Sequence, residues 1–204
     1  MSAPAKESKK RPFVIGLTGS IGMGKSETAK LFAGEGVPVF DADAAVHELY
    51  AGEAAAMIEA AFPGSTRNGV VDRAALAARV TGDAAALQRL EGLMHPLVAE
   101  RKKQFLARNS AAPVVLLDIP LLLETGEKVD AVVVATAPAQ VQRARVLARP
   151  GMTDAKFAAL LGRQMSDAQK RAQAHYLVMT DRGLDHARQQ VKMILADIKA
   201  KRDA

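Results

Sequence analysis

The chain has 204 residues, of which 49% are hydrophobic and 25% charged, and its formal net charge at pH 7 is +6. This balance predicts one sizeable globular core, and the basic excess favours an anionic partner, either a polyphosphate ligand or a nucleic acid. The absence of cysteine excludes disulfides and thiol chemistry, and the lack of tryptophan, with only 4% aromatic residues, argues against a base-stacking surface.

The first twelve residues, MSAPAKESKKRP, are polar and basic. They lack the apolar core of a signal peptide, and no apolar run in the chain approaches the roughly 20 residues of a membrane span. We therefore expect residues 1–12 to form a flexible basic tail on a cytoplasmic protein that does not act at a membrane.

Five short apolar runs without polar alternation come next. Such runs are typical of strands buried on both faces of a parallel sheet. Parallel strands need crossover connections, which are usually helices, so the predicted fold is α/β, with a parallel sheet of about five strands flanked by helices. The runs are residues 13–17, 37–40, 114–117, 129–135 and 176–179.

A glycine-rich turn follows the first run. Residues 19–26, GSIGMGKS, match the G-x-x-x-x-G-K-[ST] pattern of a phosphate-binding loop, between an apolar run and an amphipathic segment. Glycines let backbone N–H groups point inward at phosphate oxygens, and the N-terminus of the next helix adds positive potential. Lys25 is predicted to reach the β- and γ-phosphates of a nucleotide, and the Ser26 hydroxyl to bind Mg²⁺.

Carboxylates follow two other runs. Asp41 and Asp43 come after the second run, at the sheet edge where open α/β folds bind ligands, so one of them could accept a proton from an attacking hydroxyl. We expect the other to do no more than cap the next helix. Asp118 directly follows the third run, as the second metal-organising acid does in phosphate-loop proteins, although an aspartate there can also simply cap a turn.

Helical patterns fill the rest of the chain. Residues 44–110 are alanine-rich and predict helices that break at Pro63-Gly64 and at His95-Pro96, with Asp72 and Asp83 as N-caps. The other helical stretches are residues 139–173, rich in arginine and glutamine, and residues 184–202, which predict a closing amphipathic helix.

Four motifs together resemble the dephospho-CoA kinase family. They are LTGSIGMGKS from Leu17, FDAD from Phe40, HP at His95, and LDIPLLLE from Leu117 to Glu124. The phosphate loop alone is generic, but the combination is specific, and the resemblance runs over most of residues 13–183. This family phosphorylates the ribose 3′-hydroxyl of dephospho-CoA with ATP, in the last step of coenzyme A synthesis.

The resemblance implies a P-loop kinase-type organisation. The nucleotide-binding core would comprise residues 13–43, 111–138 and 174–204. Residues 44–110 would form a helical CoA-binding lobe, and residues 139–173 a helical lid over the ATP phosphates.

The resemblance also implies roles for single residues, with ATP as co-substrate and Mg²⁺ as cofactor. Asp43 would be the general base, and Lys25 and Arg149 the other catalytic residues. Ser26 and Asp118 would bind the metal, and Gln164 matches a glutamine of the lid. The implied ATP-binding residues are Gly19, Ser20, Ile21, Gly22, Met23, Gly24, Lys25, Ser26, Glu27, Arg143 and Arg149. The implied substrate-binding residues are Asp43, His95, Asp118, Pro120, Leu121, Leu122 and Glu124.

Two stretches depart from the family pattern. Ser20 and Glu27 replace a commoner glycine and threonine, at positions that we expect to tolerate outward-facing side chains. In the late segment AHYLVMTDRG, His175 replaces an aspartate and Thr180 an asparagine, which leaves the adenine-side contacts open.

The expected partners are ATP and dephospho-CoA, without nucleic acid or membrane, in a monomer or weak homo-oligomer.

Two alternative functions share part of these features. Another small-molecule kinase, acting on nucleosides or shikimate-like alcohols, would share the phosphate loop but has no reason for the D-x-P-L-L-x-E motif. A nucleotide-dependent module that binds nucleic acid would show a steep salt dependence. A GTPase is disfavoured because the sequence has no N-K-x-D motif for guanine.

Overall fold

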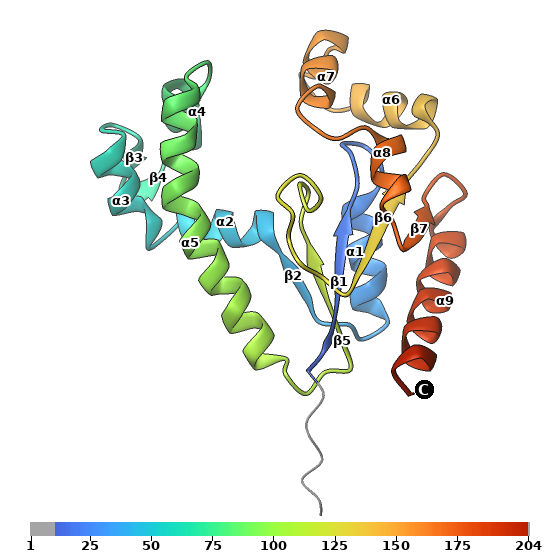
Figure 1. The fold of residues 1–204 in the computed structure, drawn as a ribbon. Coiled ribbons are helices and arrows are strands. Elements are labelled where there is room, and N and C mark those ends of the chain that lie inside the picture. Colours follow the sequence, from blue (N-terminus) through green and yellow to red (C-terminus); the bar gives the residue numbers. More distant parts are fainter. Residues whose placement is uncertain (1–10, 204) are drawn as a thin grey trace, which may run out of the picture. The chain divides into compact units, whose positions relative to one another are not determined.

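A computed structural model describes residues 11–203 (Figure 1), so the basic tail predicted for residues 1–12 lies almost entirely outside the described residues. Five parallel strands form the main sheet, in the order β2-β5-β1-β6-β7, which confirms the predicted α/β fold. The central strand β1 pairs in parallel with β5 and β6. The strands are β1 (Phe13–Thr18), β2 (Val39–Asp41), β5 (Val114–Asp118), β6 (Ala131–Thr136) and β7 (Tyr176–Met179).

Two helices cover one face of this sheet. In α1 (Lys25–Gly34) and α9 (Leu184–Asp203), apolar side chains at helical spacing pack against β1, β5, β6 and β7, and this cluster contains the largest buried side chain, Phe32. On the opposite face, Leu122 packs with Val132 and Val134 of β6. Three shorter helices, α6 (Ala139–Leu147), α7 (Asp154–Leu161) and α8 (Asp167–Ala172), lie between β6 and β7 in the chain. Among residues 11–203, no helix has the length and apolar character needed to cross a bilayer.

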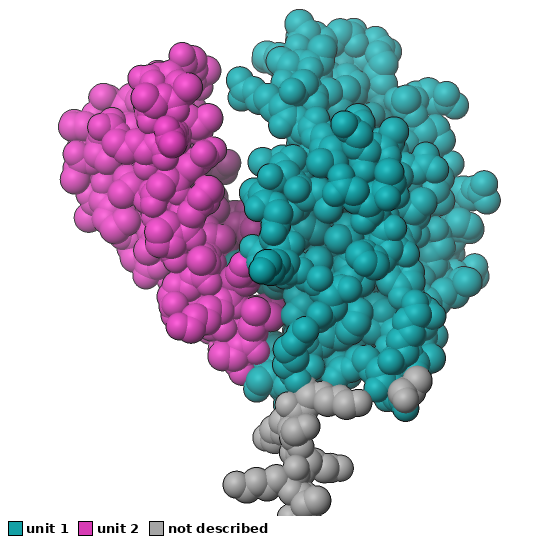
Figure 2. All heavy atoms as spheres, in the orientation of Figure 1, with its two compact units in different colours: residues 1–40, 109–204 teal, residues 41–108 magenta. Residues whose placement is uncertain are grey.

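Residues 41–108 form a compact unit of their own, coloured separately in Figure 2. Its apolar core is built mainly from the helices, with Leu49, Ile58 and Leu90 among the buried side chains, and Val71 of the second short strand joins it. Its elements are α2 (Ala42–Tyr50), α3 (Ala54–Ala61), β3 (Thr66–Arg67), β4 (Val70–Val71), α4 (Arg73–Val80) and α5 (Ala84–Arg108). Asp72 and Asp83 accept hydrogen bonds from backbone N–H groups at the starts of α4 and α5, as predicted for N-caps.

The unit departs from the all-helical pattern expected for it at a short antiparallel hairpin, β3–β4. Asn68 and Gly69 turn the chain with φ angles of 54° and 77°, as a tight hairpin turn requires. The Asn-Gly pair before Val70 is therefore the signal that sequence reasoning missed. Glu59 fixes the start of the hairpin because it accepts hydrogen bonds from the N–H groups of Gly64 and Thr66, and these bonds lower its pKa.

A second correction concerns the helix break expected at His95-Pro96. Helix α5 continues through Pro96 and ends only at Arg108. A proline inside a helix removes one N–H and crowds the carbonyl four residues earlier, which here belongs to Gly92, a residue without a side chain. Helix α3, in contrast, ends before Pro63-Gly64 as predicted.

Candidate active site

The glycine-rich loop joins the end of β1 to the start of α1, as the sequence predicted. Gly22 and Gly24 have φ angles of 80° and 86°, which only glycine adopts at low cost. A Cβ on Gly22 would also lie 2.5 Å from Cγ2 of Val146. Gly24 is the N-cap of α1, and no side chain caps this helix. The first N–H groups of α1 and its positive dipole end are therefore available to an anion.

The ammonium group of Lys25 is held by the carboxylate of Asp118. Lys25 Nζ lies 2.5 Å from Asp118 Oδ1, and the two side chains are only 14% and 2% exposed. Lys25 is the first residue of α1 and Asp118 the last residue of β5, the strand next to β1. The fold thus brings the lysine and the acid predicted for the phosphate site together in a poorly hydrated place, where their charges act strongly on a ligand.

The side chains of Ser26 and Asp118 can be compared with the ligands that Mg²⁺ prefers. Among residues 11–203, no group of three or more His, Asp or Glu side chains could form a metal cage from protein ligands alone. Mg²⁺ is usually bound by one or two side-chain oxygens together with substrate phosphates and water. The hydroxyl of Ser26, exposed in the first turn of α1, and the carboxylate of Asp118 fit that requirement.

Ser20 and Glu27, which depart from the family pattern in and after the phosphate loop, differ in exposure. Ser20, which we expected to tolerate an outward orientation, is only 3% exposed, and its Oγ has no hydrogen-bond partner among the described residues. Glu27 is exposed as expected, and its carboxylate accepts a hydrogen bond from Lys30.

Four side chains hold the backbone of the phosphate loop. Gln164 accepts a hydrogen bond from the N–H of Ile21 at 3.2 Å, and Gln142 donates one to the carbonyl of Ile21 at 2.8 Å. Thr180 donates to the carbonyl of Met23 at 2.9 Å, and Arg145 donates to Thr180 Oγ1 at 2.9 Å. Hydrogen bonds therefore hold the loop to α6, to the residue after β7 and to the segment before α8.

Sequence reasoning identified only Gln164 of these four, through the family resemblance. Arg145 stands in a run of arginines, and nothing in its spacing separates it from Arg143. Thr180 was noted as a departure from the family pattern on the adenine side, yet its side chain lies against the phosphate loop, where a Cβ on Gly24 would be only 3.0 Å from it. His175, the other departure, accepts a hydrogen bond from the N–H of Val132.

The two lid arginines differ in their contacts. Arg143 forms a bidentate ion pair with Asp154, with N–O distances of 2.8 and 2.9 Å from its NH2 group. Arg149 lies just after the end of α6, is exposed, and makes no side-chain hydrogen bond or ion pair among the described residues. Of the two guanidinium groups, that of Arg149 is the one not engaged by a protein carboxylate.

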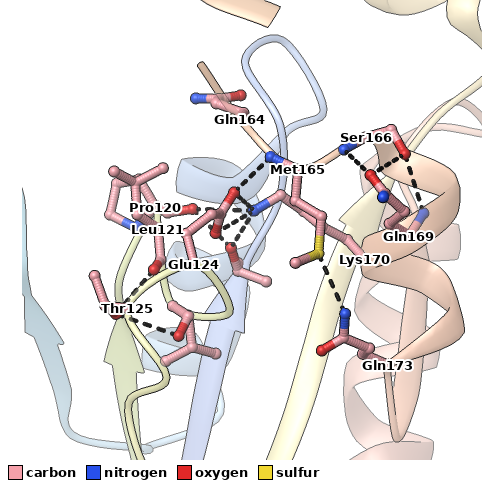
Figure 3. Close-up of polar contacts among 12 residues, drawn as sticks. Pro120, Leu121, Glu124, Thr125, Gln164, Met165, Ser166, Gln169, Lys170 and Gln173 are labelled. Atoms are coloured by element: carbon pink, nitrogen blue, oxygen red, sulfur yellow. Dashed lines mark hydrogen bonds and ion pairs between the residues drawn. The ribbon is translucent and has the colours of Figure 1, made fainter. Parts of the chain in front are cut away.

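The D-x-P-L-L-x-E segment begins at the last residue of β5 and continues into a turn (Figure 3). Leu122 is only 1% exposed and packs on Gly16, where a Cβ would lie 2.5 Å from it, whereas Leu121 is 40% exposed. The carbonyl of Pro120 accepts a hydrogen bond from Thr18. Glu124 binds Lys170 and the N–H of Met165. In this structure Leu122, Pro120 and Glu124 thus have contacts within the protein, and Leu121 alone presents an exposed apolar side chain.

The two aspartates at the junction of β2 and α2 have separate positions. Asp41 is the N-cap of α2, with Oδ1 2.9 Å from the N–H of Ala44, so it fulfils the capping role expected of one of the pair. Asp43 lies in the first turn of α2 and is exposed. His95 is an exposed residue of α5.

Comparison with known proteins agrees with this geometry. The family model described as dephospho-CoA kinase matches residues 13–186. The chain belongs to the dephospho-CoA kinase family.

Relatives named dephospho-CoA kinase support this membership. The protein of Rhodopseudomonas palustris strain BisB18 is 60% identical over 187 residues, covering 90% of this chain and 94% of that protein. The protein of Mesorhizobium japonicum is 58% identical over 193 residues, covering 93% and 98%. A crystal structure of a Thermus thermophilus protein is similar with a TM-score of 0.82 and 34% identity, covering 92% of this chain and 98% of that one. The dephospho-CoA kinase resemblance of the four sequence motifs is thereby confirmed.

Proposed function

We propose that the protein transfers the γ-phosphoryl group of ATP to the ribose 3′-hydroxyl of dephospho-CoA, giving coenzyme A and ADP. The observation that carries this proposal is the phosphate loop with its buried Lys25–Asp118 pair, in a chain of the dephospho-CoA kinase family. Phosphoryl transfer depends mainly on positioning and on neutralising charge, and both are what a rigid loop and a confined lysine supply.

Residues 19–27 are proposed to bind ATP. The loop N–H groups and the start of α1 would hold the phosphate oxygens, and Lys25 would offset negative charge at the transferring group. Ser26 and Asp118 are the residues proposed to hold Mg²⁺, which when bound neutralises charge on the phosphate oxygens.

Asp43 is proposed to accept the proton of the attacking hydroxyl. Its exposure and the fact that Asp41, not Asp43, caps α2 support this choice, since the Asp43 carboxylate is not committed to the helix end. The unit of residues 41–108 is proposed to bind dephospho-CoA, with His95 as one contact. Asp118, Pro120, Leu121, Leu122 and Glu124 stay proposals as substrate-binding residues, although Leu122 and Glu124 already serve the protein itself.

An acceptor screen tests the function. Purified protein with ATP and Mg²⁺ should release ADP rapidly with dephospho-CoA, and slowly with adenosine, shikimate or water as acceptor. The product should carry its new phosphate on the 3′-oxygen, which phosphorus NMR identifies. Equal rates with all acceptors, or a preference for shikimate or adenosine, would assign the protein to another small-molecule kinase activity.

Arg149 gives a prediction for the lid. Because its guanidinium is not engaged by a protein carboxylate, we propose that it acts on the γ-phosphoryl group, so Arg149→Ala should lower kcat by about 10²-fold while the Kd for ATP changes little. Arg143→Ala is the matched control, since Arg143 is paired with Asp154, and it should lower kcat less. Equal effects of the two changes on steady-state kinetics would contradict a special role for Arg149.

A monomeric or weakly oligomeric state, a cytoplasmic location and the absence of a nucleic-acid partner stay predictions. The excess of positive charge has a sufficient explanation in this proposal, because ATP and dephospho-CoA are both polyanions.

A further inference from the structure

Lys170, in α8, is a fully buried lysine, with 0% of its side chain exposed. Its Nζ lies 2.7 and 2.9 Å from the two carboxylate oxygens of Glu124 (Figure 3). It also lies 3.4 Å from Thr18 Oγ1 and 3.4 Å from the carbonyl oxygen of Pro120. One ammonium group therefore joins α8 to the end of β1 and to the turn after β5.

Glu124 also binds the backbone just before α8. Its Oε1 accepts a hydrogen bond from the N–H of Met165 at 2.9 Å. Met165 directly follows Gln164, whose Oε1 accepts the hydrogen bond from the N–H of Ile21 in the phosphate loop. Glu124 thus fixes the backbone one residue away from the side chain that touches the loop. The amide nitrogen of Gln164 makes no hydrogen bond within residues 11–203, so it can donate to a phosphate oxygen.

The structure favours the charged form of the Glu124 carboxylate. Partial burial raises the pKa of Glu124, but the hydrogen bonds from Lys170 and from the N–H of Met165 outweigh it and leave that pKa below its ordinary value. Burying an ion pair seldom adds more stability than apolar side chains of similar size would. Stability alone therefore gives little reason for a lysine at position 170, whereas fixing the register of a segment does.

We propose that Lys170 and Glu124 are a positioning ion pair that holds Gln164 against the phosphate loop, and so sets the loop for nucleotide binding and phosphoryl transfer. This inference deepens the proposed function and rests on it for the turnover measurements. It gives Glu124 a role within the protein in addition to the substrate contact that the family resemblance implies.

The first test separates this role from mere stability. Glu124→Gln leaves a buried ammonium without its carboxylate and should lower the melting temperature by about 10 °C. The double variant Lys170→Met/Glu124→Gln removes both charges and keeps an oxygen for the N–H of Met165, so its melting temperature should return close to that of the wild type. Its kcat should nevertheless stay about tenfold below that of the wild type, because Gln164 is no longer held in place. Recovery of kcat together with melting temperature would overturn the proposal.

The second test asks whether the pair acts through Gln164. Calorimetry of ATP binding without any acceptor should show the double variant and Gln164→Ala each weakened several-fold. Adding Gln164→Ala to the double variant should change the Kd by less than about twofold, since residues in one network do not act additively. If the double variant and Gln164→Ala each raise the Kd by the same factor whether or not the other change is present, the proposal is contradicted. Arg171→Met, an exposed neighbour on the same helix, is the control and should leave kcat and Kd unchanged.

Glu124→Asp provides an alternative test if the double variant does not fold. Glu124→Asp keeps the charge but shortens the arm, so it should weaken ATP binding in the presence of Gln164 and not in the Gln164→Ala background. Wild-type affinity in Glu124→Asp, or equal weakening in both backgrounds, would overturn the proposal. These binding measurements need no dephospho-CoA, so they stand even if the acceptor screen points to another substrate.

Discussion

Replacing Lys25 with methionine should lower kcat by about 10³-fold, because its charge is needed at the transferring phosphoryl group. The ammonium group is confined beside Asp118, with 14% of the Lys25 side chain exposed, so water cannot replace its charge at the transferring phosphoryl group. Loss of the charge also leaves the buried Asp118 carboxylate without this partner. We therefore expect a lower melting temperature, and not only a lower rate.

A second variant separates the two effects of Lys25. Lys25→Met/Asp118→Asn removes both charges of the pair and should recover much of the melting temperature, because a buried carboxylate that has lost its lysine destabilises the fold more than a neutral amide at the same place does. Its kcat should stay as low as that of the single variant. Turnover at saturating ATP and dephospho-CoA, measured beside thermal unfolding, distinguishes the outcomes. Near-wild-type turnover in either variant would overturn the assignment of residues 19–26 as the ATP phosphate site.

The second large effect is expected for Asp43→Asn, which should lower kcat by about 10²–10⁴-fold, the usual contribution of a positioned general base. Asparagine keeps the shape of the side chain and loses its charge and its ability to take the proton. Asp43 is exposed in the first turn of α2, so the change should cost at most about 1 kcal/mol of stability through the helix dipole. The Kd for ATP should be unchanged.

Asp41→Asn is the matched control. Asp41 caps α2 through the N–H of Ala44, and asparagine is about as good an N-cap as aspartate, so both stability and kcat should be preserved. A dead Asp41→Asn beside an active Asp43→Asn would mean that the base is Asp41. If neither change affects kcat, the D-A-D stretch is only a strand-to-helix turn and another group activates the hydroxyl.

The main sheet and the phosphate loop could be predicted from sequence because their signals are local. Buried parallel strands read as unbroken apolar runs, and a phosphate loop needs glycine and lysine at fixed spacing. The caps at Asp72 and Asp83 were predictable for the same reason. The hairpin at Asn68-Gly69 also had a local signal, which the alanine-rich surroundings obscured.

Other features depend on contacts between distant segments. No spacing in the sequence shows that Arg145 reaches Thr180, or that Lys170 reaches Glu124, because these pairs form only when the chain after β6 folds back on the sheet. Ser20 was expected to tolerate an outward-facing side chain, and the structure buries it. Pro96 was expected to end a helix, yet the surrounding helix has enough packing to continue through it.

The hydrogen bonds that hold the phosphate loop affect the entropy of nucleotide binding. Hydrogen bonds from Gln142 and Thr180 hold the carbonyls of Ile21 and Met23, and both partners of each bond belong to the protein itself. The conformational entropy of the loop is then lost during folding and not during binding. The loop is therefore preorganised for ATP. Binding of the phosphates is opposed by little loss of backbone entropy, and more of their interaction energy contributes to affinity.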